Sequence, residues 1–214
     1  MKKTLLLFLV LCCAVSAPCL SLAEAQAQTE AYSPVLDMYI AGLSGDEAVQ
    51  ELDEFNISCL LCPMYDEAPD PLQTIGCAFL DLDGDAVPEL LIGGTEALGE
   101  RFLFDVWTLE NDAPVLALRG WERNRMYLRS DESGITFYNE GSNSAFESIF
   151  RLGRLVEGSM EWTYTLLCIT DEETVWTLND APVGEDEANR LLQQWQEGVF
   201  DPELTPLAAL LQLS

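Results

Sequence analysis

The chain has 214 residues, of which 37 are Asp or Glu and 10 are Lys or Arg, so its formal net charge is −27. Such an acidic chain repels phosphate backbones and anionic lipid headgroups, which argues against nucleic-acid binding and against docking on anionic membranes. The chain contains no histidine, and this excludes Ser-His-Asp and Cys-His catalysis as well as zinc or iron sites with histidine ligands.

Residues 1–25 have the pattern of a secretory signal peptide. Two lysines precede an apolar run from residue 5 to residue 17, and the small residues Ala23 and Ala25 offer a cleavage point. The apolar run is shorter than the roughly 20 residues that a membrane span needs. The cysteines of this segment lack the small preceding residues of a lipidation site. We therefore expect a secreted or extracytoplasmic protein with no lipid anchor and no membrane span after cleavage.

Residues 26–214 are predicted to form a single globular domain, with its first few residues mobile. Ser33 and Pro34 suit the start of a helix, because serine can cap and proline fits the first helical turn. Apolar side chains then recur at helical spacing and predict a buried face made of Tyr32, Leu36, Tyr39 and Leu43. A capping box at Ser44 predicts a second short helix that ends near Phe55.

The predicted mature chain keeps four cysteines, Cys59, Cys62, Cys77 and Cys168. In an exported protein they predict disulfides or buried thiols, and the sequence leaves the pairing open. Cys59 and Cys62 form a C-x-x-C, but it lies in a proline-containing connector and not in a βαβ unit. A redox role for this pair is kept as an alternative, as is a zinc site, although a second C-x-x-C is missing.

From residue 75 onward, short apolar stretches alternate with turn signals, which is typical of consecutive antiparallel hairpins. We predict an α+β fold: an antiparallel β meander of about eight or nine strands, with N-terminal and C-terminal helices packed on it. The expected strands cover residues 75–80, 89–92, 102–109, 114–119, 126–129, 134–138, 145–151, 160–169 and 174–178.

The C-terminal part is predicted to be helical. Three acidic residues at 185–187 favour a helix start through the helix dipole, and Gly198 ends the helix. Its predicted buried stripe is Ala188, Leu191, Leu192 and Trp195. A last short helix is expected after Thr205 and Pro206.

The loop between the first two predicted strands carries regularly spaced oxygen ligands. Acidic side chains at Asp81, Asp83, Asp85 and Glu89 fall at positions 1, 3, 5 and 9, and the Val87 carbonyl falls at position 7. This spacing suits a hard cation with six to eight oxygens at roughly 2.3–2.6 Å. The alternative is a hairpin with a solvated Asp-Gly turn.

The loop departs from an EF-hand at two positions. An EF-hand needs glycine at position 6 and a bidentate glutamate at position 12, and here these positions hold Ala86 and Ile92. Alanine penalises a left-handed backbone by roughly 1–2 kcal/mol. The flanking residues also predict strands and not helices, so we expect a calcium loop within a β-hairpin.

The segment Asp81-Leu82-Asp83-Gly84-Asp85-Ala86-Val87-Pro88-Glu89-Leu90 resembles the DxDGDGxxEL loop of FG-GAP/VCBS-type repeats. It is also similar to a group of uncharacterised secreted or lipoprotein-like bacterial proteins. These share an early Tyr-x-x-Val-Leu-x-x-Tyr helix, here residues 32–39, and a Leu-x-x-Ile-Gly-x-Ala segment, here residues 72–78. The resemblance implies calcium binding and an envelope location, and no reaction. One copy of the loop is present, so a whole β-propeller is not expected.

The sequence thus predicts an exported calcium-binding protein with a structural or binding role toward an unknown protein or glycan. Aromatic residues on predicted strands, such as Trp107, Trp162 and Trp176, would stack on sugars if exposed, although core packing is the favoured interpretation. The alternative is an envelope hydrolase that uses paired carboxylates or the bound cation. No catalytic residue is assigned, and an enzyme is not favoured.

Overall fold

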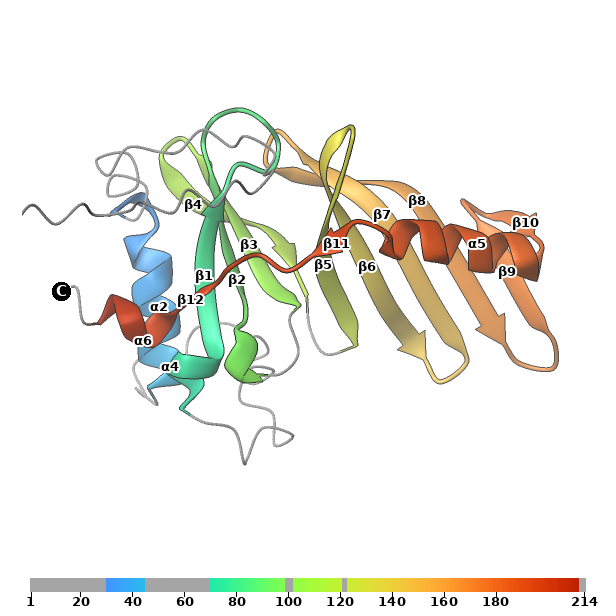
Figure 1. Cartoon of the computed structure of the whole chain (residues 1–214), viewed down its shortest axis with the longest axis horizontal. Coiled ribbons are helices and arrows are strands. Elements are labelled where there is room, and N and C mark those ends of the chain that lie inside the picture. The colour runs from blue at the N-terminus through green and yellow to red at the C-terminus, as the bar shows by residue number, and fades with distance from the viewer. Residues whose placement is uncertain (1–29, 45–69, 99–101, 121–122, 212–214) are drawn as a thin grey trace, which may run out of the picture.

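The computed structural model describes residues 30–44, 70–98, 102–120 and 123–211, which form one twisted sheet with helices at both ends (Figure 1). The helices are α2 (Ser33–Leu43), α4 (Pro71–Thr74), α5 (Glu185–Gln196) and α6 (Leu207–Leu210), with the 3-10 turn η3 (Glu96–Leu98). The strands are β1 (Ile75–Leu80), β2 (Glu89–Gly94), β3 (Leu103–Glu110), β4 (Ala113–Arg119), β5 (Asn124–Asp131), β6 (Gly134–Ser144), β7 (Glu147–Val156), β8 (Ser159–Thr170), β9 (Thr174–Leu178), β10 (Ala181–Val183), β11 (Val199–Phe200) and β12 (Thr205–Pro206).

Most strands that are neighbours in the sheet are also neighbours in the sequence. The order is β10-β9-β8-β7-β6-β5-β3-β2-β1-β12, while β4 pairs with β3 and β11 pairs with β5. Every pairing between the described strands is antiparallel. The predicted α+β class with a β meander is confirmed. All nine predicted strands are present, and the three further strands have only two or three residues each.

The N-terminal helix packs against the first strands. The four predicted apolar positions of α2 are buried in a cluster with β1, β2 and β3 side chains, among them Ile75, Leu90 and Phe104. The helix start differs from the prediction, because Tyr32 is the N-cap and Ser33 makes no side-chain cap. The N–H groups of Val35 and Leu36 instead bond to the Tyr32 carbonyl at 3.0 Å, and the Tyr32 side chain is buried in the core.

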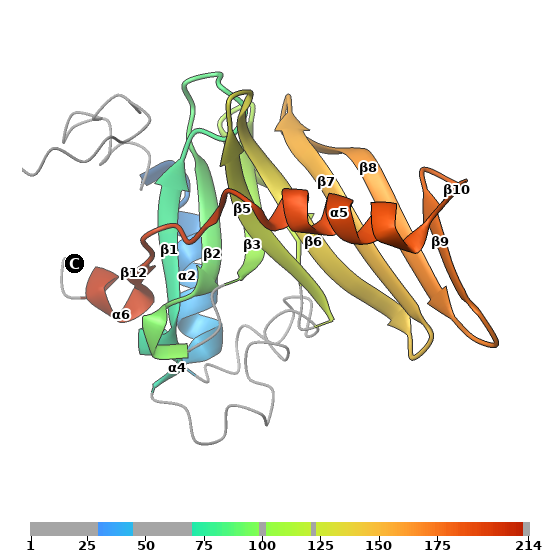
Figure 2. The same cartoon turned by 45° about the vertical axis from the view of Figure 1, so that its right-hand side comes forward.

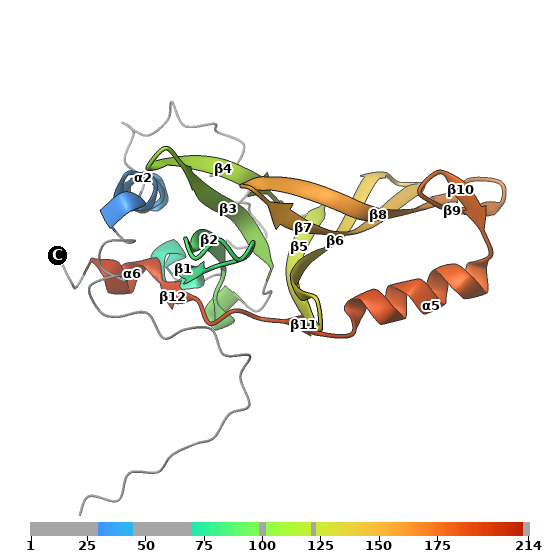
Figure 3. The same ribbon diagram turned by 90° about the horizontal axis from the view of Figure 1, so that it is seen from above.

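A second core lies on the other face of the sheet, where the sheet curls and β4 approaches β8. Its fully buried side chains include Leu91, Val106 and Leu128. A third core lies under α5, which crosses β6 to β9 (Figure 2). The predicted stripe of α5 is confirmed, because Ala188 and Trp195 are buried there and the two leucines are half-buried. Viewed from above, α2 and α5 lie at opposite ends of the molecule (Figure 3).

Several predictions fall outside the described residues. They are the signal peptide at residues 1–25, the short helix after Ser44, and the C-x-x-C of Cys59 and Cys62. Cys77 and Cys168 are buried free thiols. Burial raises the pKa of Cys77 to about 11, which makes it a poor nucleophile. None of the described helices has the length and apolar character needed to cross a membrane.

Candidate metal centre

The acidic loop closes the hairpin of β1 and β2. Strand pairing runs without interruption from Ile75 opposite Gly94 to Leu80 opposite Glu89. The two strands therefore hold both ends of the loop in a fixed register, and the loop acids are confined to residues 81–88 plus the first residue of β2. A cation bound there would be held by a preformed turn at the end of a buried hairpin.

Hydrogen bonds from the backbone to the loop's own acids shape the turn. Asp81 accepts from the N–H of Gly84 at 2.7 Å and from the N–H of Ala86 at 3.1 Å. Asp83 accepts from the N–H of Asp85 at 3.2 Å, and Asp85 accepts from the N–H of Val87 at 2.7 Å. Each carboxylate oxygen has two lone pairs, so these bonds leave capacity for a cation.

Two residues of the loop adopt the left-handed backbone that a tight turn requires. Gly84 has φ +85°, which glycine tolerates at no steric cost. Ala86 has φ +69°, where a Cβ atom is disfavoured. The expected penalty of alanine at position 6 is therefore present in the folded loop.

Three of the predicted acidic ligands converge. One carboxylate oxygen each from Asp81, Asp83 and Glu89 lies within 4.8 Å of the other two. Two oxygens on opposite sides of a calcium ion would be roughly 4.6–5.2 Å apart, so this group is compact enough to share one ion. The group does not include Asp85, whose side chain caps the Val87 N–H. Val87 itself is 40% exposed.

Glu89 is the unusual member of this group, because only 1% of it is exposed. Its carboxylate accepts from the N–H of Leu82 at 2.8 Å and from the hydroxyl of Thr108 at 3.3 Å. Burial, and then the negative charges of Asp83 and Asp85, raise the pKa of Glu89 to about 7, against the lowering effect of the Leu82 N–H. No Lys or Arg among the described residues forms an ion pair with it.

A buried carboxylate of this kind has two ways to avoid the cost of an unpaired charge. It can keep its proton, or it can bind a cation. The donor set here consists of carboxylate oxygens only, which suits a hard divalent cation such as calcium and does not suit a soft metal. Asp81, Asp83 and Glu89 therefore fit the calcium ion that the spacing of the loop predicts.

The burial of Glu89 was not predicted, although its position on β2 carried one signal. Glu89 and Leu91 point to the same face of β2, because side chains alternate along a strand, and Leu91 lies in the second core. The contact of Tyr32 with the loop was also not predicted. The Tyr32 hydroxyl donates to the Pro88 carbonyl at 3.1 Å. The Tyr32 ring also contacts Phe79, with ring centroids 5.8 Å apart. The start of α2 therefore rests on the end of the acidic loop.

The remaining sequence candidates have structural partners. The Trp107 indole donates to the Tyr39 hydroxyl at 3.4 Å, the guanidinium of Arg151 lies 5.6 Å from the Trp162 ring centre, and Trp176 packs against Phe150. None of these indoles is an exposed platform for a sugar ring. Arg119 and Asp105 form a salt bridge at 3.3 Å.

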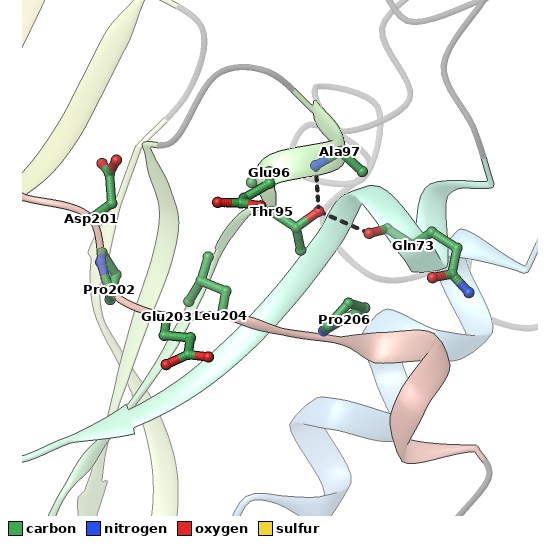
Figure 4. Close-up of a pocket in the computed structure, with 10 residues that line it drawn as sticks. Gln73, Thr95, Glu96, Ala97, Asp201, Pro202, Glu203, Leu204 and Pro206 are labelled. Carbon is green, nitrogen blue, oxygen red and sulfur yellow. Dashed lines mark hydrogen bonds between the residues drawn. The ribbon is translucent and has the colours of Figure 1, made fainter. Parts of the chain in front are cut away.

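A cavity of about 510 Å³ lies beside α4, at the end of the β1–β2 hairpin away from the acidic loop (Figure 4). Its wall includes Thr95, which accepts from the N–H of Ala97 at 3.3 Å and donates to the Gln73 carbonyl at 2.8 Å. Asp201 and Glu203 also line it, but their carboxylates point in opposite directions in Figure 4. These two acids do not form the facing pair that a glycoside hydrolase requires.

No family model, no curated protein and no solved structure matches this chain.

Proposed function

We propose that this chain is an exported protein that binds one calcium ion in the loop at residues 81–89 and has a structural or binding role outside the cytoplasm. The observation that carries the calcium part is the convergence of three carboxylates, one of which is buried with no basic partner among the described residues. Asp81, Asp83 and Glu89 are the proposed side-chain ligands. Asp85 and the Val87 carbonyl remain predicted ligands from their spacing.

The proposed role of the ion is to stabilise the hairpin. Carboxylates about 4 Å apart repel each other by about 1 kcal/mol in water and by more where water is excluded. A divalent cation replaces this repulsion by attraction and anchors the loop to β2. Calcium at about 100 times its Kd would then add about 2.7 kcal/mol to the free energy of unfolding, which corresponds to a rise in Tm of about 5–10 °C for a chain of this size.

The test is thermal unfolding at neutral pH in excess calcium and in excess EDTA. Wild type is expected to show the rise in Tm with calcium, and Asp83→Asn is expected to lose it. Asn keeps an oxygen for the Asp85 N–H but removes the charge. Asp112→Asn is the matched control: this residue lies in the turn between β3 and β4, has φ +62° that asparagine tolerates, and is outside the acidic group. Equal calcium shifts in wild type and Asp83→Asn would refute the proposal.

The proposal of export rests on the pattern of residues 1–25 and has its own test. Expression of the whole chain, followed by mass spectrometry of the product, reports where the N-terminus lies. Cleavage after Ala23 or Ala25, with the product outside the cytoplasm, is the expected result. An intact N-terminus in a cytoplasmic product would contradict it. The hydrolase alternative would need a pair of facing acids or an open position on the bound cation, and Asp201 and Glu203 of the cavity do not face each other.

A further inference from the structure

Apolar side chains gather at the end of the sheet farthest from α2. Two of the exposed large apolar residues of the described chain are cross-strand neighbours at this end: Val175 is 49% exposed and Ile169 is 39% exposed. We call these two the tip patch. Ile169 is paired with Val175 on β9 and with Glu147 on β7.

The tip patch lies on the face of the sheet that α5 does not cover. Leu166 is buried under α5, so alternation along β8 sends the side chains of Leu167 and Ile169 to the opposite face. Leu167 is half-buried and pairs with Ile149 of β7 and with Thr177 of β9. The apolar surface therefore continues from the patch into the sheet, and no described element lies over it (Figure 3).

The strand beside the patch has an open edge. The edge strand β10 pairs only with Trp176, Thr177 and Leu178 of β9. Thr174 and Val175 extend beyond it, and no described strand pairs with their outer side. An unpaired strand edge next to exposed apolar side chains is a template for an added extended segment.

The rim of the patch is strongly acidic. The turn from β8 to β9 is Asp171-Glu172-Glu173, all exposed, and Glu147 lies beside Ile169. The sequence has no Lys or Arg between Arg154 and Arg190, so no basic residue of β8, β9 or β10 offsets these acids. A partner that covers the apolar centre must therefore bring positive charge to the rim.

We propose that the tip patch and the open edge of β9 bind an extended segment of a partner protein that alternates apolar and basic side chains. Its apolar side chains would cover Val175 and Ile169, and its Lys or Arg side chains would meet the acidic turn. Alternation is required because successive side chains of an extended segment point to opposite sides.

The negative charge of the chain argues against two other occupants of the tip patch. A second copy of this chain would bring the same acidic rim against itself, and each copy has a formal charge of −27. An anionic membrane surface would be repelled in the same way. The positively charged partner segment is the occupant that satisfies both the apolar centre and the acidic rim.

The test uses the full mature chain and two labelled peptides, one that alternates Lys with Val and one that alternates Lys with Ser. Binding is measured by fluorescence anisotropy at about 0.15 M salt, where charges more than about 8 Å away are screened. Wild type is expected to bind the Lys/Val peptide at least about 10-fold more tightly than the Lys/Ser peptide, a difference of about 1.4 kcal/mol.

The variant Ile169→Thr/Val175→Thr keeps β-branched side chains but removes apolar surface, and it is expected to bind both peptides equally. The variant Glu172→Gln/Glu173→Gln is expected to bind both peptides more weakly than wild type does. Leu211→Thr is the matched control, since Leu211 is 49% exposed and directly follows α6, which lies at the other end of the molecule; it is expected to leave both affinities unchanged. Circular dichroism establishes that each variant is folded.

Three results would overturn the proposal. The first is an Ile169→Thr/Val175→Thr variant that binds the Lys/Val peptide as tightly as wild type does. The second is a dimer in sedimentation velocity that this variant abolishes, because it would make a second copy the occupant. The third is binding to phosphatidylglycerol vesicles that this variant abolishes, because it would make a lipid surface the occupant.

Discussion

The most direct test of the acidic loop is to replace Glu89 with glutamine in the calcium-free protein and to follow stability against pH. Glutamine keeps an oxygen for the Leu82 N–H and can still bond to Thr108, but it carries no titratable proton. The comparison with wild type therefore isolates the ionisation of one side chain from that of all the other acids.

The sign of the effect follows from the direction of the shift. Burial raises the pKa of Glu89 from its ordinary value of 4.5 to about 7. Between these values the folded protein holds a proton that the unfolded chain has released, so the folded state binds more protons. The free energy of unfolding of wild type therefore falls as pH rises through this window. Its full stability is present below pH 4.5, and the loss is complete above pH 7.

The magnitude comes from the same shift. Each tenfold change in a protonation equilibrium is 1.36 kcal/mol, so the shift corresponds to about 3 kcal/mol in total, of which about 2 kcal/mol falls between pH 5 and pH 8. Glu89→Gln has no titratable carboxyl group at this position, so its free energy of unfolding does not fall in this way. In EDTA the free energy of unfolding of the variant, relative to that of wild type, is expected to rise by about 2 kcal/mol between pH 5 and pH 8.

Urea unfolding of both proteins at half-unit steps from pH 5 to pH 8 measures this difference. The titration of the remaining acids affects both proteins and cancels in the comparison. Curves that stay parallel over the whole range would show that Glu89 ionises normally in the fold, and the argument from its burial would fail. Calcium at pH 8 is expected to restore wild type and to leave Glu89→Gln unchanged.

Three further predictions concern the acidic loop, its contact with Tyr32 and the pairing of β7 with β8, each measured by urea unfolding in EDTA. Ala86→Gly is expected to raise the free energy of unfolding by about 1 kcal/mol, because Ala86 has φ +69°; a decrease would show that the backbone there is not left-handed. Tyr32→Phe removes the bond to the Pro88 carbonyl and is expected to cost about 1 kcal/mol; no change would mean that the bond does not form. Gly153→Ala is expected to cost about 1–3 kcal/mol, because its Cβ would lie 2.3 Å from the Glu161 carbonyl; an unchanged stability would contradict the pairing of β7 with β8.

The regular strands and the long helices could be predicted because each carries its own periodic pattern. β1 to β9 follow from short apolar stretches between turn signals, and α5 follows from the stripe that ends at Trp195 and Gly198. The three shortest strands could not be predicted in this way. β11 contains only Val199 and Phe200, and it is a strand because it meets Leu128 and Arg129, which are distant in sequence. Such pairings depend on the assembled sheet and not on local preference.

In the candidate metal site, too, the features with a local cause in the sequence could be predicted and those that depend on distant residues could not. The loop acids could be predicted because their spacing is local, and three of the four predicted acidic side chains lie together in the fold. Asp85 lies outside this group, and its carboxylate accepts from the Val87 N–H. The burial of Glu89 could not be read from the loop, because it depends on Thr108 from β3 and on the core around Leu91.

The contact between Tyr32 and the loop connects the proposed metal site to the N-terminal helix. Burial, and then the charges of Glu89 and Asp85, raise the pKa of Tyr32 well above its usual range, which means that the loop's negative field reaches this hydroxyl. Its hydrogen bond to Pro88 holds the last turn of the loop against the first residues of α2. Neutralising the loop acids by a cation would reduce the field at Tyr32 without breaking this bond. An ion that orders the loop would also order the Pro88 carbonyl to which Tyr32 donates, and so would connect the hairpin that contains its ligands to the start of α2.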